Sequence, residues 1–197
     1  MTTLVAITGG IGSGKSTFSR VVRSKGFKLL DSDEFVADIY KNPTNKFLKY
    51  LKKINLDVCI TGKRIDKKKI AQSIFSDRKT KSKLENYIFK EVREDRKKFI
   101  KKHKKLKTKI VFFDIPLLFE NNLSTSFDIN ISIISKKKER YKRLKRSRNM
   151  SKELFKKIVK SQTTDVERKK ISHIIVTNNK SRDQYIKKIN KVLERLV

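Results

Sequence analysis

A glycine-rich segment near the N-terminus carries the clearest chemical pattern of the 197-residue chain. Four of the chain's six glycines fall within six residues: Gly9, Gly10, Gly12 and Gly14. Lys15 and Ser16 follow, which completes the pattern G-x-x-x-x-G-K-[ST]. Such a loop turns backbone N–H groups toward phosphate oxygens, its lysine reaches the outer phosphates of a nucleoside triphosphate, and its serine ligates Mg²⁺. The alternative is a glycine-rich strand–helix turn that binds no ligand.

Two carboxylates close the second predicted strand, in the sequence Leu29-Leu30-Asp31-Ser32-Asp33. Ligands of open α/β sheets bind at the carboxyl ends of the strands, where these side chains fall. A carboxylate here would accept the proton of an acceptor hydroxyl or help to position Mg²⁺. We predict the catalytic role for Asp33 and a supporting role for Asp31. Asp33 could also cap the helix that follows, and the two roles are compatible.

A third acidic position follows a buried strand, in the segment Asp114-Ile115-Pro116-Leu117-Leu118-Phe119-Glu120. Asp114 has the position of the aspartate that holds Mg²⁺ through water in Walker-B sites. No glutamate follows it directly, which argues against a motor ATPase. The apolar residues 117–119 would either pack in the core or line a substrate pocket.

A basic helix is predicted at residues 136–148. Arg140, Arg143 and Arg146 recur every three residues and therefore share a broad face. An arginine-bearing segment that closes over phosphates would stabilise the charge of a transition state. The alternative is a solvated basic face, which we expect for the lysines of this helix.

The elements that position these residues alternate between strands and helices. Strands are predicted at residues 4–8, 27–30, 110–114, 129–134 and 174–176. Helices are predicted at residues 15–25, 33–53 with a break at Pro43, 66–76, 78–106, 136–148, 151–161, 165–171 and 182–196. This alternation predicts an α/β fold with a doubly wound, parallel five-stranded sheet. Residues 45–105 contain no clear strand, so they are predicted to form a helical insertion.

The composition limits the possible classes of function but does not identify one. The chain holds 52 Lys+Arg against 20 Asp+Glu, a net charge of +32, which is typical of proteins that bind nucleic acid or anionic membrane. However, 39 of the basic residues are lysines, so codon drift in an AT-rich genome is an alternative. Residues 90–109 and 136–160 carry 19 of the 32 excess charges. One cysteine, Cys59, and the lack of an apolar membrane-spanning run favour the cytoplasm.

Taken together, these residues resemble the dephospho-CoA kinase family. The resemblance rests on Ile7-Thr8-Gly9-Gly10-Ile11-Gly12-Ser13-Gly14-Lys15-Ser16-Thr17, on Leu30-Asp31-Ser32-Asp33 and on Asp114–Glu120. Near the C-terminus it continues with Gln162, Glu167-Arg168-Lys169, His173–Val176 and Asn178-Asn179. It departs from the family pattern at Phe89-Lys90, Ser147 and Ser172-His173.

The resemblance implies transfer of the γ-phosphoryl group of ATP to the ribose 3′-hydroxyl of dephospho-CoA. It implies Asp33 as the base, Lys15 as the phosphate clamp, and Arg140 and Arg143 as catalytic phosphate contacts. Together with the loop motif, it predicts ATP-binding residues Ile11, Gly12, Ser13, Gly14, Lys15, Ser16 and Thr17. The predicted substrate-binding residues are Thr8, Asp33, Pro116, Leu117, Leu118, Phe119 and Glu120. Ser16, and Asp114 through water, are the predicted Mg²⁺ ligands.

The resemblance also implies an organisation into three parts. We expect a single domain with a core at about 1–40, 107–135 and 172–197, a helical substrate-binding subdomain at about 41–106, and a helical lid at about 136–162. We expect no membrane partner and no specific nucleic acid, and we favour a monomer. The alternatives are a related kinase of nucleoside monophosphates or shikimate, and a P-loop protein that binds nucleic acid with a steep salt dependence.

Overall fold

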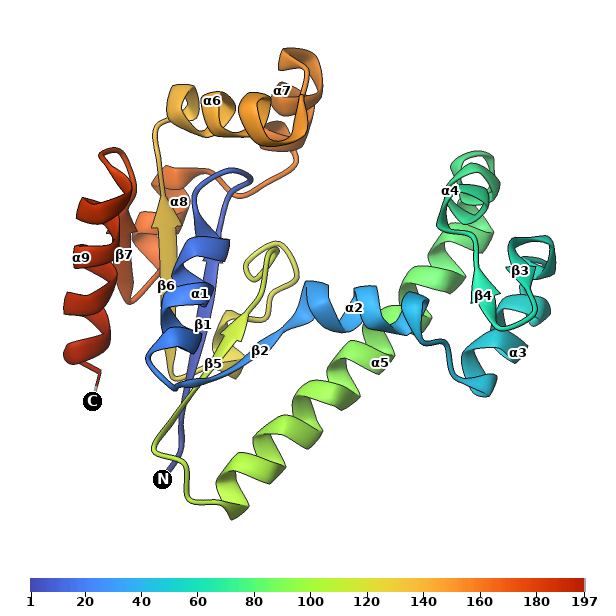
Figure 1. Ribbon diagram of the computed structural model, residues 1–197, viewed down its shortest axis with the longest axis horizontal. Coiled ribbons are helices and arrows are strands. Elements are labelled where there is room, and N and C mark those ends of the chain that lie inside the picture. The colour runs from blue at the N-terminus through green and yellow to red at the C-terminus, as the bar shows by residue number, and fades with distance from the viewer. Residues whose placement is uncertain (197) are drawn as a thin grey trace. The chain divides into compact units, whose positions relative to one another are not determined.

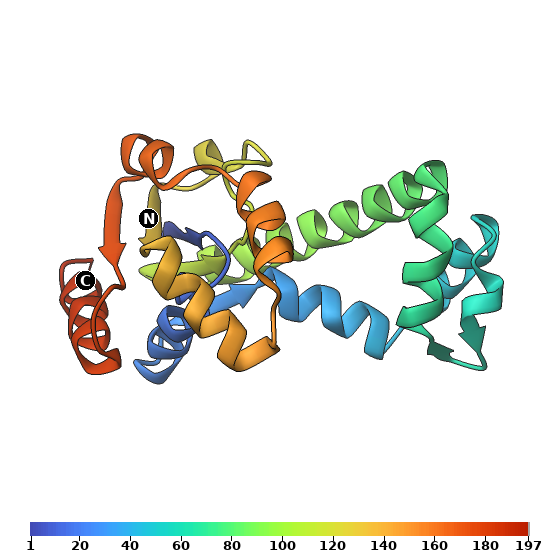
Figure 2. The same cartoon turned by 90° about the horizontal axis from the view of Figure 1, so that it is seen from above.

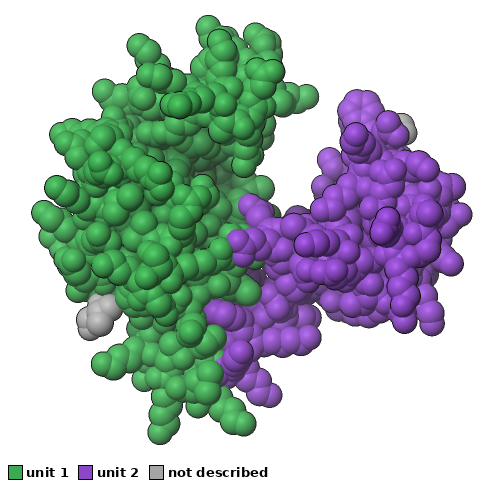
Figure 3. Space-filling view, viewed as in Figure 1, with its two compact units in different colours: residues 1–31, 103–197 green, residues 32–102 purple. Residues whose placement is uncertain are grey.

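A parallel five-stranded sheet lies at the centre of the first of two structural units. The computed structural model describes residues 1–196. The first unit comprises Met1–Asp31 and His103–Val197, and the second comprises Ser32–Lys102 (Figure 3). The sheet is ordered β2-β5-β1-β6-β7, and every neighbouring pair is parallel. Its strands are β1 (Thr3–Gly9), β2 (Lys28–Asp31), β5 (Ile110–Asp114), β6 (Ile129–Ile134) and β7 (Ile174–Thr177).

Residues 110–113 of β5 are apolar on both faces, as a covered parallel sheet requires, whereas in β6 isoleucine alternates with the buried polar residues Asn130 and Ser132. All five residues of β5 are buried, and so are the last five of β6. The register pairs Ile7 with Asp114 and Asp31 with Asp114 on adjacent strands. The carboxyl ends of β1, β2 and β5 therefore bring the phosphate loop, Asp31 and Asp114 to one edge of the sheet.

Helices complete the first unit. They are α1 (Lys15–Ser24), α6 (Lys137–Arg148), α7 (Lys152–Lys160), α8 (Asp165–Ile171) and α9 (Arg182–Glu194). A short 3-10 turn, η2 (Ser124–Ser126), precedes β6. Figures 1 and 2 show α6 and α7 above the carboxyl end of the sheet, on the side of the loop that follows β1. The lid predicted at 136–162 thus forms two helices beside the phosphate loop.

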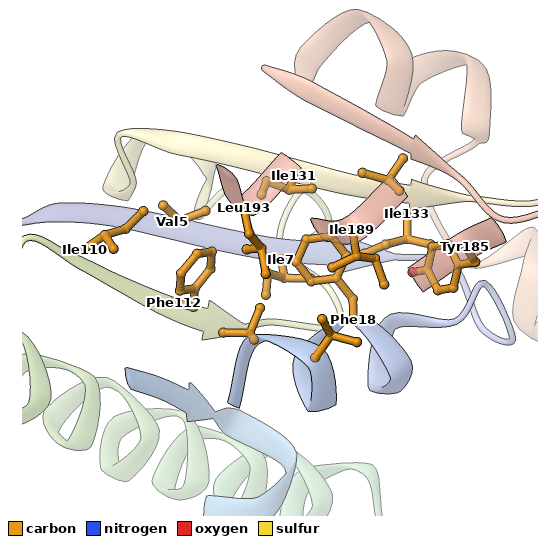
Figure 4. Packing of buried hydrophobic residues seen from close by; sticks show 13 residues of the cluster. Val5, Ile7, Phe18, Ile110, Phe112, Ile131, Ile133, Tyr185, Ile189 and Leu193 are labelled. Carbon is orange, nitrogen blue, oxygen red and sulfur yellow. The ribbon is translucent and has the colours of Figure 1, made fainter. Parts of the chain in front are cut away.

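The core of this unit joins α1 and α9 to the sheet. Phe18 of α1 and Ile189 of α9 are fully buried in one cluster with Ile7 and Ile133 (Figure 4). Val22 of α1 is fully buried in the same cluster. Burying one such side chain contributes about 1.5–3 kcal/mol. This packing fixes the start of α1, and with it the loop that precedes α1.

The second unit is mainly helical and has its own core. Its helices are α2 (Ser32–Lys41), α3 (Asn45–Lys53), α4 (Lys67–Ser76) and most of α5 (Arg78–Lys105), with a 3-10 turn η1 (Asp57–Cys59). Phe47, Leu51 and Leu84 lie at the centre of its apolar cluster. α3 begins at a Thr44 cap, whose side chain accepts the Phe47 N–H, and the chain breaks at Pro43 as predicted.

Five strands and the helices were predicted to within about three residues, and the fold class is confirmed. The prediction of no strand in residues 45–105 was wrong. β3 (Ile60–Thr61) and β4 (Arg64–Ile65) form a two-stranded antiparallel hairpin around Gly62, which has a φ of +60°. Strands of two residues are too short to produce a periodic pattern. Within residues 1–196, every helix is too short or too polar to cross a membrane.

Candidate active site

The glycine-rich loop joins β1 to α1, and α1 opens at Lys15. Gly14 stands at the helix N-cap with a φ of 107°, a conformation that side chains disfavour. Because glycine has no capping side chain, the first N–H groups of α1 stay available to an anion, and the helix dipole favours negative charge there. Ser16 is exposed in this first turn, and Thr17 is half-buried.

Lys15 and Asp114 form a buried ion pair at the edge of the sheet. The Lys15 side chain is 17% exposed, that of Asp114 is 2% exposed, and Lys15 Nζ contacts Asp114 Oδ1. The second carboxylate oxygen of Asp114 accepts a hydrogen bond from the Ser19 hydroxyl at 2.5 Å. Ser19 was not predicted, although its place one helical turn after Lys15 is a usable signal. The ion pair thus joins Lys15, which is predicted to bind phosphate, to Asp114, which is predicted to hold Mg²⁺ through water.

Arg140 lies against the phosphate loop and keeps one unpaired donor. Its Nε donates to the carbonyl oxygen of Ile11 at 2.7 Å, and its Nη1 lies 3.6 Å from Asp165. Nη2 is buried and has no hydrogen-bond partner in the described chain. A methyl group added at Gly10 would collide with this guanidinium. Burial lowers the Arg140 pKa, and the Asp165 carboxylate opposes that shift.

Arg143, in contrast, has both terminal nitrogens occupied by protein acceptors. Nη1 donates to the Gly12 carbonyl at 3.2 Å and to the Ser135 hydroxyl at 3.1 Å. Nη2 donates to the backbone and side-chain oxygens of Asn178 at 2.8 and 3.2 Å. Arg143 therefore holds the Gly12 carbonyl of the loop against the segment that contains Asn178. The third predicted arginine, Arg146, is exposed.

Glu120 ties the segment after β5 to the segment after α7. Its Oε1 accepts the Thr163 N–H at 2.7 Å and the Arg168 Nη2 at 3.1 Å. Arg168 is 1% exposed and is among the largest fully buried side chains. Gln162, next to Thr163, accepts the Ile11 N–H at 2.9 Å. Thus the N–H of Ile11, a predicted ATP contact, is already bonded within the protein.

The roles of Arg168 and Gln162 were missed by sequence reasoning, although both residues belong to the family pattern quoted above. No spacing rule links Arg168 with Glu120, which lies 48 residues away. A capping box does appear in the sequence, because the Thr164 and Glu167 side chains bond each other's backbone N–H groups. It marks the start of α8 and thus the helix that carries Arg168.

The apolar segment after Asp114 divides into exposed and buried positions. Leu117 is 40% exposed, whereas Leu118 is fully buried and Phe119 is 9% exposed. For Leu118 and Phe119 this favours the core-packing alternative over direct substrate contact. Thr8 is fully buried, and its hydroxyl donates to the Pro116 carbonyl at 3.3 Å. Thr8 and Pro116 therefore shape the same edge of the sheet as Leu117.

Asp33 belongs to the second unit, where it lies exposed in the first turn of α2. α2 begins at Ser32, so Asp33 is inside the helix and the capping alternative does not describe it. Asp31 is the last residue of β2 in the first unit. Among the described residues, no three His, Cys, Asp or Glu side chains come together as a metal site.

Comparison with known proteins decides the family. The sequence model of dephospho-CoA kinase matches residues 3–184. The chain belongs to the dephospho-CoA kinase family. The enzyme of this name from Streptococcus mutans is 32% identical, over 100% of this chain and 98% of its own length. The one from Fusobacterium nucleatum is 30% identical, over 98% of each chain.

A solved structure of a family member agrees with the fold. The dephospho-CoA kinase from Campylobacter jejuni aligns with a TM-score of 0.75 and 25% identity, over 100% of this chain and 98% of that chain. The reaction of the dephospho-CoA kinase family is the last step of coenzyme A biosynthesis. The chain is therefore a P-loop kinase with a small-molecule acceptor, and the predicted family and enzyme class are confirmed.

Proposed function

We propose that this kinase transfers the γ-phosphoryl group of ATP to the ribose 3′-hydroxyl of dephospho-CoA. The loop between β1 and α1, with the Lys15–Asp114 pair at its base, supports the phosphoryl transfer, and the family match over residues 3–184 supports the acceptor. Phosphoryl transfer needs little covalent help from a protein, so catalysis comes from positioning and charge. These groups supply both at one edge of the sheet.

Lys15 and the loop amides would hold the β- and γ-phosphates. The two proposed Mg²⁺ ligands, Ser16 and Asp114, suit that ion, because Mg²⁺ prefers one or two oxygen ligands from the protein together with phosphate and water. Ser16 offers an exposed hydroxyl, and Asp114 offers a carboxylate that Ser19 and Lys15 keep oriented. Bound there, Mg²⁺ supplies charge neutralisation on the phosphates. The fixed position of Asp114 is this chain's contribution.

Arg140 is the better of the two predicted arginines for direct phosphate contact. Among the described residues its buried Nη2 has no hydrogen-bond partner, and it lies beside Gly10, whereas the terminal nitrogens of Arg143 are bonded to protein oxygens. An unpaired buried guanidinium nitrogen is costly, and a phosphate oxygen would satisfy it. We therefore assign the transition-state contact to Arg140 and loop support to Arg143.

Asp33 is the proposed base that accepts the proton of the 3′-hydroxyl. The second unit, which begins at Ser32, is the proposed substrate-binding subdomain, and 136–162 is the proposed lid. Leu117, the exposed apolar residue of its segment, is the proposed contact for the acceptor. We expect a cytoplasmic monomer, and Cys59 is a buried free thiol with no disulfide role.

A steady-state assay with ATP, Mg²⁺ and a panel of acceptors tests the proposal. We expect turnover with dephospho-CoA and background rates with AMP and shikimate. Asp33→Asn should lower kcat by about 10²–10⁴-fold, the usual contribution of a general base. Glu34→Gln, the adjacent acidic residue of the same helical turn, is the matched control and should keep kcat within about threefold. Near-normal kcat in Asp33→Asn would remove Asp33 from the base role.

A further inference from the structure

Four consecutive carbonyl groups of the phosphate loop, at residues 11–14, each accept a hydrogen bond from a distant side chain. The distances from donor to carbonyl are 2.7, 3.2, 2.8 and 3.2 Å along the loop. The donors, in the same order, are Arg140, Arg143, Asn178 and Tyr185. In a trans peptide the C=O of one residue points opposite to the N–H of the next. Holding these carbonyls outward therefore turns the N–H groups of Gly12, Gly14 and Lys15 inward, whereas the Ser13 N–H donates to the Gly10 carbonyl at 3.0 Å.

Asn178 makes the contact that matters most among the four. Its Nδ2 is the only partner that the described structure gives to the Ser13 carbonyl. The Gly14 carbonyl, which Tyr185 contacts, also accepts the backbone N–H groups of Thr17 and Phe18. Losing the tyrosine hydroxyl would leave the Gly14 carbonyl satisfied, whereas losing the Asn178 amide would leave the Ser13 carbonyl without a partner.

Arg143 fixes which end of the Asn178 side chain faces the loop. A guanidinium only donates, so the contact between Arg143 Nη2 and Asn178 Oδ1 requires the oxygen on that side. The amide nitrogen must then face Ser13. Asn178 is 6% exposed, and its backbone oxygen accepts the Ser135 hydroxyl at 2.6 Å. Its position and its orientation are both set by neighbours.

We infer that Asn178 is a positioning residue for ATP binding. It acts through the peptide between Ser13 and Gly14, whose N–H it turns toward the phosphates. Tyr185 supports the next peptide with a smaller effect. A methyl group added at Gly14 would collide with the Asn178 amide, so glycine is needed for this close approach. The inference rests on the proposed use of the loop for ATP, and it does not depend on the acceptor.

Asn178→Asp tests the inference, because it removes the donor toward Ser13 and retains an acceptor for Arg143. Asn179→Asp is the matched control. It adds the same charge at the next residue, which is exposed and whose Oδ1 already accepts the Lys136 N–H at 2.8 Å. ADP affinity is measured by titration calorimetry without any acceptor, together with KM for ATP, KM for dephospho-CoA, kcat and the thermal midpoint.

We expect Asn178→Asp to weaken ADP binding and to raise KM for ATP about tenfold, the size of one buried hydrogen bond. KM for dephospho-CoA should stay near that of the control, and the thermal midpoint should fall by several degrees because the buried Ser13 carbonyl loses its donor. Asn179→Asp should bind ADP within about twofold of wild type. Tyr185→Phe should lose no more than about threefold. If Asn178→Asp does not fold, Asn178→Ala replaces it with the same expected loss of ADP affinity.

Two results would overturn the inference. The first is unchanged ADP affinity in Asn178→Asp, which together with a lower thermal midpoint would make Asn178 purely structural. The second is an equal loss in both aspartate variants, which would assign the effect to charge alone. If the wild-type enzyme binds ADP but does not phosphorylate dephospho-CoA, the proposed reaction is contradicted. The inference on Asn178 is then still decided by the ADP affinity of Asn178→Asp.

Discussion

Replacing the buried Arg168 by methionine should strongly lower the free energy of unfolding. Arg168 is 1% exposed, and it donates to Glu120 Oε1 at 3.1 Å. It also contacts the Thr163 carbonyl at 2.5 Å and lies 3.4 Å from Asp165. Arg168→Met fills much of the volume but leaves the Glu120 carboxylate without its cation. The variant therefore measures the cost of stranding the Glu120 charge together with the loss of the other Arg168 contacts.

The expected loss of free energy of unfolding is about 3 kcal/mol. Breaking a buried ion pair by removing one partner costs about 3–5 kcal/mol, because the remaining charge stays buried. The Glu120 side chain is 17% exposed and keeps the Thr163 N–H, so the lower end of this range applies. In a chain of this size, 1 kcal/mol corresponds to about 2–4 °C, so the thermal midpoint should fall by about 6–12 °C.

Thermal unfolding followed by far-UV circular dichroism is the assay. Lys169→Met is the matched control, since Lys169 is the next residue of α8 and is exposed, and it should change stability by less than about 0.5 kcal/mol. The double variant Arg168→Met/Glu120→Gln removes the stranded charge and should regain about 1 kcal/mol. A midpoint of Arg168→Met within about 2 °C of the control would refute the reasoning, as would strictly additive effects in the double variant.

Three further predictions concern the loop and its surroundings. Lys15→Ala should lower kcat by about 10²–10³-fold because it removes a phosphate donor, and near-normal steady-state turnover would contradict this. Gly14→Ala should weaken ADP binding in calorimetry by more than about tenfold. Gly26→Ala should cost only about 1–2 kcal/mol of stability, because Gly26 has a φ of +80° and a methyl group there would meet no described residue within 4 Å apart from its chain neighbours. Equal ADP affinities in the two variants would count against the crowding argument. Ser19→Ala deprives Asp114 of a hydrogen bond and should lower the urea-derived free energy of unfolding by about 1–2 kcal/mol, and no change would show that the bond is dispensable.

The sheet could be predicted from the sequence because its strands bear a strong local signal. Residues 110–113 are a continuous apolar run, isoleucine recurs at every second position from 129 to 133, and the strands are Ile110–Asp114 and Ile129–Ile134. The hairpin at residues 60–65 could not, because its strands are two residues long. The phosphate loop was found by its residue pattern, and its backbone conformation follows from Gly12 and Gly14, both with positive φ.

The contacts behind the loop could not be predicted, because their partners are far apart in the chain. Arginine spacing indicated that Arg140 and Arg143 share a face, but it did not separate the one with an unpaired nitrogen from the one bonded to protein oxygens. That difference comes from Asn178, which lies 35 residues beyond Arg143 and 165 beyond Ser13. Only the folded sheet places β7 beside the loop.

The proposed reaction places the new phosphate at one position of the acceptor, the ribose 3′-oxygen. The direct test is to incubate the enzyme with ATP, Mg²⁺ and dephospho-CoA and to map the new phosphate by phosphorus NMR and by digestion with a 3′-specific nucleotidase. We predict a single product with phosphate on the ribose 3′-oxygen and one ADP for each molecule formed. Phosphate on the 2′-oxygen, or ADP release with no phosphorylated dephospho-CoA, would contradict it.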